Sequence, residues 1–259
     1  LQGYTNELEE RVQSRTQALA EANEQLKSLD KLKSKFVSDV SHELRNPLTN
    51  LTLYLELLEY APPGKQAKYF NTLRNQVRRL SNLVEEILTL SRLESNKYTH
   101  LYQPVDFNYL VQQVVTVHKA RAQSKQLKLT FTPTFPLPPA WGEPHQLTQI
   151  VTNLLDNALN YTAQGSIQVS TSLQQNGGHS EIELGVSDTG MGIPQEDLPH
   201  IFERFYRGSQ IDREAMAGTG LGLGIVSEIV ALHNGRIDVT STPNKGTIFT
   251  VHLPIAPQQ

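Results

Sequence analysis

A histidine with chemically useful neighbours lies in the segment FVSDVSHELRNPLT, residues 36–49. Glu43 follows His42, and its carboxylate can accept a hydrogen bond from one imidazole nitrogen, which makes the other nitrogen a better nucleophile. Asn46 lies one helical turn after His42, where its amide could hold a water molecule. A lone helical histidine is usually a surface residue, so the hypothesis of a nucleophilic His42 depends on these neighbours.

Pro47 lies in the same predicted helix. Because proline has no N–H, it cannot bond the carbonyl of Glu43 one turn back, and we expect a kink or a loosened turn immediately after His42. A nucleophile beside a bending point can be repositioned by torque from upstream. We therefore expect Pro47 to be the yielding point of the helix.

Two asparagines, Asn153 and Asn157, lie four residues apart and share one face of a predicted helix. An amide oxygen is a plausible ligand for Mg²⁺, which keeps several waters and takes substrate phosphates. Taken alone, the pair would more often be two polar residues on a solvated face.

The run Asp188-Thr189-Gly190-Met191-Gly192 follows a β-type segment. Its carboxylate could accept from an exocyclic amine and its glycines could approach a flat ring, although a simple Asp-Gly turn would look the same.

Two further motifs could bind anions. In Phe202–Arg207, Arg204 or Arg207 could contact phosphate oxygens, although an amphipathic turn docked by its aromatic residues is an equal alternative. The glycine-rich run Gly218–Gly224 precedes an apolar helix, whose N-terminus presents free N–H groups to anions. No Gly-Lys-Ser/Thr follows, so the run is not a P-loop.

The histidine requires a long helix to carry it. Residues 5–60 have no proline before Pro47 and repeat apolar residues in alternating steps of four and three, a heptad seam that Arg15 and Lys33 break. A helix that buries one narrow stripe needs a partner, so the seam favours a parallel coiled coil and a homodimer over a single amphipathic helix on a globular body. The seam residues are Leu8, Val12, Leu19, Ala22, Leu26, Leu29, Phe36 and Val40.

A turn signal, Ala61-Pro62-Pro63-Gly64, separates this helix from a second helical pattern over residues 69–90. Two long helices joined by a short turn predict a helical hairpin, and two hairpins would make a four-helix bundle. From about residue 102 short β-type runs alternate with helical stretches, which predicts an α+β domain with a mixed sheet. The predicted strands are 127–131, 166–172, 181–187, 236–240 and 247–253, and the predicted helices are 106–123, 143–160 and 221–233.

Two turns are also predicted in this part of the chain. Asn176-Gly177-Gly178 indicates a hairpin turn, and His233-Asn234-Gly235 indicates a helix C-terminus with Gly235 in the left-handed conformation.

The composition excludes several classes of protein. The 259 residues include no cysteine, which rules out disulfides, Cys-ligated zinc, iron–sulfur clusters and a thiol nucleophile. The net charge of −3 argues against nucleic acid as a partner. No apolar run reaches about 18 residues, so we expect no membrane contact within this segment. Because the chain opens at Leu1 inside a helical pattern, we expect it to be the C-terminal part of a longer protein with a sensor domain upstream.

The stretch around His42 resembles the H-box of sensor histidine kinases of two-component systems. The resemblance implies that His42 is autophosphorylated with help from Glu43, and that the phosphoryl group passes to an aspartate on the receiver domain of a response regulator. It also implies that Asn46 supports the reverse phosphatase reaction. The alternatives are an ATPase of the GHKL type and a non-catalytic dimeric signalling scaffold.

The later motifs, together with Asn244–Phe249, resemble the N, G1, F, G2 and G3 boxes of the ATP-binding domain of that family, which has the Bergerat fold. The resemblance implies ATP and Mg²⁺ as cofactors, with Asn153 on the metal and residues 193–217 as a mobile lid. It departs from the family at Asn160, where members often carry a lysine, so that Arg204 would carry more of the phosphate contact. The implied nucleotide-binding residues are Asn153, Asn157, Tyr161, Asp188, Gly190, Gly192, Arg204, Arg207, Gly218, Thr219, Gly220, Leu221, Gly222 and Thr247.

The sequence thus predicts an α plus α/β protein, in which a coiled coil and a dimeric four-helix bundle precede an α/β-sandwich ATP-binding domain. The predicted domains are a signal-transmitting linker over 1–33, a dimerisation and phosphotransfer hairpin over 34–97, and a catalytic domain over 102–256. The expected location is the cytoplasm, as a free protein or as the cytoplasmic part of a membrane-anchored sensor.

Overall fold

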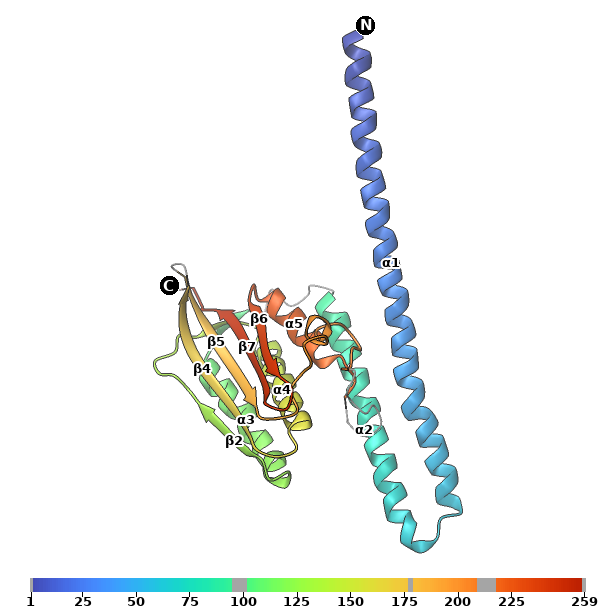
Figure 1. Ribbon diagram of the computed structural model, residues 1–259, viewed down its shortest axis with the longest axis vertical. Coiled ribbons are helices and arrows are strands. Elements are labelled where there is room, and N and C mark those ends of the chain that lie inside the picture. Colours follow the sequence, from blue (N-terminus) through green and yellow to red (C-terminus); the bar gives the residue numbers. More distant parts are fainter. Residues whose placement is uncertain (1, 95–101, 177–178, 209–217, 258–259) are drawn as a thin grey trace. The chain divides into compact units, whose positions relative to one another are not determined.

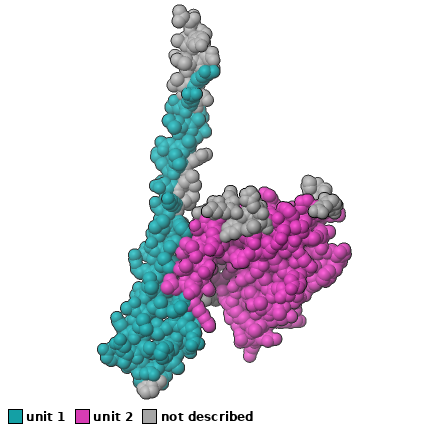
Figure 2. All heavy atoms as spheres, turned by 180° about the vertical axis from the view of Figure 1, so that it is seen from behind, with its two compact units in different colours: residues 1–77 teal, residues 78–259 magenta. Residues whose placement is uncertain are grey.

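The computed structural model describes residues 2–94, 102–176, 179–208 and 218–257. The chain forms two compact units, residues 1–77 and 78–259, which Figure 2 shows in different colours. None of the described helices combines the length and the apolar character that a membrane crossing requires.

The first unit is a helical hairpin. Helix α1 spans Gln2–Glu59, and helix α2 begins at Pro63, continues into the second unit and ends at Glu94 (Figure 1). Proline suits the first turn of a helix because the N–H that it lacks would have no partner there. The rings of Tyr54 and Tyr69 pack across the hairpin, with centroids 5.7 Å apart. The structure thus contains the predicted turn between two long helices.

Helix α1 runs through Pro47 without a break. Pro47 is buried, while His42 and Asn46 are exposed. The proline removes one backbone hydrogen bond, but the turns on both sides remain helical. The loosened turn expected after His42 is therefore not accompanied by an interruption of the helix.

The second unit contains a five-stranded mixed sheet, as the sequence predicts. Its strand order is β2-β4-β5-β7-β6, in which β2 and β4 are parallel and the other pairs are antiparallel. The strands are β2 Lys128–Thr132, β4 Ser166–Asn176, β5 His179–Asp188, β6 Arg236–Thr242 and β7 Gly246–Pro254.

Three helices cover one face of this sheet (Figure 1): α3 Phe107–Ser124, α4 Pro144–Tyr161 and α5 Gly222–Leu232. Asp106 caps α3 by accepting from the Tyr109 backbone N–H, and Glu143 caps α4 by accepting from two backbone N–H groups. The core lies between the layers. Its fully buried side chains include Ile150, Leu154, Leu155, Ile167, Ile182 and Leu184. Each contributes about 1.5–3 kcal/mol by leaving water.

Some elements differ from the sequence-based expectation. A small antiparallel sheet of β1 Gln103–Val105 and β3 Ala140–Gly142 was not predicted, because three residues are too few to show periodicity. At the end of α5 the left-handed residue is Asn234, with φ of 53°, and not Gly235. Gly235 is needed for space instead, since a Cβ there would lie 2.3 Å from the His252 carbonyl oxygen. The predicted turn at 176–178 falls partly outside the described residues.

Candidate functional site

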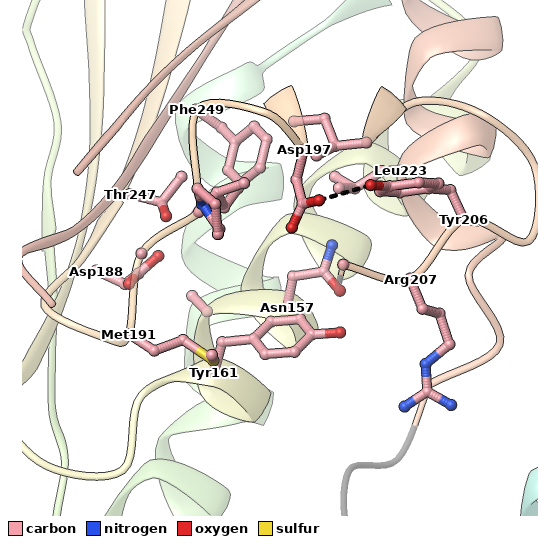
Figure 3. A pocket seen from close by; sticks show the side chains of 16 residues that line it. Asn157, Tyr161, Asp188, Met191, Asp197, Tyr206, Arg207, Leu223, Thr247 and Phe249 are labelled. Atoms are coloured by element: carbon pink, nitrogen blue, oxygen red, sulfur yellow. Dashed lines mark hydrogen bonds between the residues drawn. The ribbon is translucent and has the colours of Figure 1, made fainter. Parts of the chain in front are cut away.

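A pocket opens in the second unit between α4, the end of β5 and the segment that follows it (Figure 3). The pocket is partly open to solvent, as binding sites for small organic ligands are. Its lining is mostly apolar with a few polar side chains. The lining residues are Asn157, Ala158, Tyr161, Asp188, Met191, Gly192, Ile193, Pro194, Asp197, Ile201, Tyr206, Arg207, Gly208, Leu223, Thr247 and Phe249.

Asp188 ends strand β5 and places a carboxylate in this apolar surrounding. Its side chain is 8% exposed, and Oδ1 accepts a hydrogen bond of 2.8 Å from the Gly190 backbone N–H. Burial raises the pKa of Asp188, while backbone hydrogen bonds from Gly190 and Thr247 oppose that rise. The second carboxylate oxygen can accept a hydrogen bond from an amino group of a bound ring.

The glycines after Asp188 allow the chain to pass between two other backbone segments. A Cβ on Gly190 would lie 2.4 Å from the Tyr161 carbonyl oxygen. Gly192 has φ of 68°, and a Cβ there would lie 2.1 Å from the Thr242 carbonyl oxygen. A larger residue at either position would displace this wall of the pocket.

Helix α4 contributes Asn157 and Tyr161, one turn apart, to the pocket. Burial raises the pKa of Tyr161, and the nearby charge of Arg207 opposes that rise. Asn153, one turn earlier, lies outside the pocket lining and donates from Nδ2 to the Gly222 carbonyl oxygen at 3.2 Å. Its amide carbonyl oxygen is the atom that could ligate a cation.

The glycine-rich loop lies beside these helix residues. Gly220 has φ of 76°, and its carbonyl accepts from the Phe205 backbone N–H at 2.9 Å. A Cβ on Gly218 would have the Tyr161 hydroxyl as its nearest neighbour, at 3.9 Å, and one on Gly222 would have Asn153 at 3.8 Å. The structure therefore brings the loop together with the asparagine helix, next to the N-terminus of α5. The predicted loop residues Gly218, Thr219, Gly220, Leu221 and Gly222 do not line the pocket themselves.

The two arginines of the aromatic motif lie apart. Arg207 lines the pocket and is drawn there in Figure 3. Arg204 instead lies 3.9 Å from Glu228 of α5, measured from Nη2 to Oε2. Of the two, Arg207 is the guanidinium at the pocket.

Several residues of the site carry no signal in the sequence. Asp197 is 3% exposed, lines the pocket and accepts from the Tyr206 hydroxyl at 2.7 Å, as the dashed line in Figure 3 shows. Asp197 lies ahead of the Phe202–Arg207 motif, in a segment with neither helical nor strand periodicity, so its inward side chain could not be identified beforehand. Met191 and Thr247, by contrast, fall inside motifs that the sequence already marked.

A polar network joins α3 to α4 near the asparagines. Arg121 donates to Asp156 at 2.5 Å and to Asn160 Oδ1 at 2.7 Å, and His118 Nε2 lies 3.5 Å from Asp156. Although burial alone would raise the pKa of Asp156, its contacts with His118 and Arg121 lower it. A cation from α3 thus lies against Asn160, the position where the family often carries lysine.

The histidine of α1 lies in the first unit. His42 and Asn46 are exposed, and Glu43 is partly buried. The nucleophile candidate is therefore accessible, as attack on an external phosphoryl group requires.

Among the described residues no group of three or more His, Cys, Asp or Glu could hold a metal ion. That result is compatible with a magnesium site, because Mg²⁺ takes few protein ligands when phosphates and water supply the rest.

Two family models match the chain. The His Kinase A (phospho-acceptor) domain matches residues 32–96, and the Histidine kinase-, DNA gyrase B-, and HSP90-like ATPase family matches residues 142–257. The first match falls on the helical hairpin with the accessible histidine, and the second on the α/β sandwich that contains the pocket. The chain belongs to the sensor histidine kinases, and its second domain is an ATP-binding domain of that family.

Relatives support this membership. The sensor protein kinase WalK of Staphylococcus saprophyticus is 34% identical over 231 residues, which cover 87% of this chain and 37% of WalK. The histidine kinase AdeS of Acinetobacter baumannii has a TM-score of 0.66 at 28% identity, covering 83% of this chain and 98% of AdeS. Full-length ShkA in complex with AMPPNP has a TM-score of 0.62 at 28% identity, covering 85% of this chain and 46% of ShkA. The chain spans little more than a third of the length of WalK.

Proposed function

We propose that this chain is an ATP-dependent protein-histidine kinase that phosphorylates His42 and passes the phosphoryl group to an aspartate of a response regulator. The exposed His42 beside Glu43, on the helix that the phospho-acceptor family model covers, carries this proposal. The imidazole attacks the γ-phosphorus, the bond to the β-phosphate oxygen breaks, and ADP leaves. Glu43 orients the imidazole and accepts its proton.

In the proposed complex the adenine occupies the pocket, where Asp188 accepts from the amino group and Tyr161 packs on the ring. Arg207, at the pocket, is the guanidinium best situated for phosphate oxygens, and the glycine-rich loop with the α5 N-terminus lies nearby. The AMPPNP complex of ShkA supports this class of ligand. Asn153 would hold Mg²⁺, which supplies charge neutralisation at the phosphates when bound.

The proposed domains are a linker over 1–33, a dimerisation and phosphotransfer hairpin over 34–97, and a catalytic domain over 102–256. The proposed assembly is a homodimer that works with a receiver domain and with a sensor domain outside this chain, in the cytoplasm. His42 belongs to the first unit and the pocket to the second, so the proposed phosphoryl transfer takes place between the two units.

The test of the kinase is transfer of label from γ-labelled ATP. The chain should acquire an acid-labile phosphate that His42→Gln abolishes, while His145→Gln, which changes another exposed histidine, should keep it. Unchanged labelling of His42→Gln would refute the assignment. Release of free phosphate with no labelled protein would indicate the GHKL ATPase instead.

A second test concerns the phosphatase reaction. If Asn46 positions the attacking water, Asn46→Ala should lose dephosphorylation of the response regulator by tenfold or more, on the order of one lost charge-assisted hydrogen bond. It should keep autophosphorylation. Asn50→Ala, one turn further along α1, serves as the control. Equal loss of both reactions in Asn46→Ala would make the residue structural.

A further inference from the structure

A carboxyl group of α2 contacts the glycine-rich loop. The Thr219 hydroxyl donates a hydrogen bond to Glu86 Oε2, and Thr219 is 8% exposed. Both residues belong to the second unit. The hydrogen bond joins a helix that begins in the histidine hairpin to a loop proposed to face the phosphates.

Glu86 occupies a position that would suit an apolar residue. Leu83, Leu90 and Leu93 are each at most 2% exposed, and Glu86 lies between them on the same stripe of α2 at steps of three and four. A carboxyl group on such a stripe is costly to bury. Within the part of the chain that the structure describes, the hydrogen bond from Thr219 is the contact that offsets that cost.

The electrostatic surroundings of Glu86 favour its neutral form. Burial raises its pKa from 4.5 to about 7, the Thr219 hydrogen bond opposes the rise, and the Asp156 carboxylate of α4 adds to it. Arg121 and His118 of α3 face the same region through Asp156. Loop residues 218–222 bring no charged side chain.

We propose that Glu86 is a positioning residue that docks the glycine-rich loop on α2 through Thr219 and that must leave the loop when nucleotide phosphates bind. The proposal rests on ATP binding beside this loop. The hydrogen bond holds the Thr219 hydroxyl on α2, so the loop must break it to turn to the phosphates, and docking and nucleotide binding compete.

The sign of the pH dependence follows from linkage. Docked Glu86 binds its proton near pH 7, and released Glu86 is expected to return to its ordinary value of 4.5. The docked state therefore gains stability as the pH falls through 7 and loses it as the pH rises. ATP should bind more tightly at pH 8 than at pH 6, and its binding should release a proton between these pKa values.

Two substitutions separate docking from charge. Glu86→Gln cannot titrate but can still accept a hydrogen bond from Thr219. Its affinity for ATP should therefore be as weak at every pH as that of the unmodified chain at pH 6. Glu86→Ala cannot dock the loop. Its affinity for ATP should therefore be as tight at every pH as that of the unmodified chain at pH 8. Glu85→Gln, which changes the exposed neighbour, should follow the unmodified chain.

The measurement is titration calorimetry of the full chain with Mg-ATP. The unmodified chain should bind about three- to tenfold more tightly at pH 8 than at pH 6. At pH 6.5, buffers of different ionisation heat should report a proton released on binding, and this release should be absent in both Glu86 variants. Thermal melting would check that each variant is folded.

Three results would overturn the proposal: proton uptake, equal pH dependence in Glu86→Ala, or tight binding by Glu86→Gln at pH 6. These results are distinct from failure of the kinase, because His42 labelling is read separately. If His42 is labelled while all four proteins bind ATP alike, the docking role of Glu86 is wrong and the kinase stands.

Discussion

The carboxylate of Asp188 illustrates how one residue can serve the site at the expense of the fold. It is buried in an apolar pocket with a raised pKa, so its charge is less favourable in the folded chain than in water. Two backbone hydrogen bonds hold it in place, and we propose that one of its oxygens accepts a hydrogen bond from the bound adenine. On this proposal the charge serves binding rather than stability.

We therefore predict that Asp188→Asn weakens ATP binding without lowering the melting temperature. Loss of a hydrogen bond to a charged group costs about 1.5–3 kcal/mol, or roughly ten- to hundredfold in Kd. Calorimetry and thermal melting would check both parts, with Asp238→Asn on exposed β6 surface as the control. A variant that binds ATP normally would remove Asp188 from the proposed site.

At this scale the sequence identified the pocket residues that lie in compact motifs. Asn157, Tyr161, Asp188 and Gly192 meet in one pocket, and each lies on or shortly after a recognisable helix or strand. Glu86 could not be found in this way. Its partner Thr219 is 133 positions away, and nothing in the helical pattern around Glu86 marks such a contact.

At the scale of elements, two glycines of the glycine-rich loop differ in why the backbone needs glycine. Gly220 has φ of 76°, and a Cβ there would lie 2.7 Å from the Phe205 carbonyl carbon. Gly222, two residues later, begins α5, and its nearest such contact is 3.8 Å away. Gly220 is therefore required by its left-handed backbone and by lack of space, whereas neither constraint applies to Gly222.

We predict that Gly220→Ala destabilises the chain by about 1–3 kcal/mol, because it forces a left-handed residue against backbone. Gly222→Ala should be tolerated, since its position is helical and open. Denaturant unfolding of both variants would measure the difference. Equal stability would mean that the loop moves freely enough to relieve the clash.

Elements with strong periodicity were predictable to within a few residues, as with α4 and β7. The short strands β1 and β3 were not, because their pairing is decided by distant segments. The end of α5 was placed correctly, but its left-handed residue was assigned to Gly235 instead of Asn234. Asparagine tolerates that conformation, so the local sequence left two candidates.

The helical hairpin leaves apolar side chains uncovered. Leu53 and Leu57 of α1, and Phe70 and Val77 of α2, are between 41% and 57% exposed. Leu53 and Leu57 lie one helical turn apart and Phe70 and Val77 two turns apart, so each pair shares one face of its helix, as the apolar residues of a helix–helix interface do. A second copy of the chain would cover these faces, as the proposed four-helix bundle requires.

We expect the unmodified chain to be a dimer and the double variant Leu53→Lys with Phe70→Lys to be a monomer. Burying two lysines at the interface would cost several kcal/mol. Light scattering after gel filtration would report the mass, and Lys65→Glu, an exposed change on the same hairpin, is the control. An unmodified chain that runs as a monomer would refute the bundle.

The continuity of α2 has a mechanical consequence. The boundary between the units falls inside this helix, which has no glycine or proline after Gly64 to act as a joint. A rotation of α2 imposed at its hairpin end would therefore carry Glu86 around the helix axis and break its hydrogen bond to the glycine-rich loop. The same rotation would then both reposition the hairpin that carries His42 and release the loop for nucleotide.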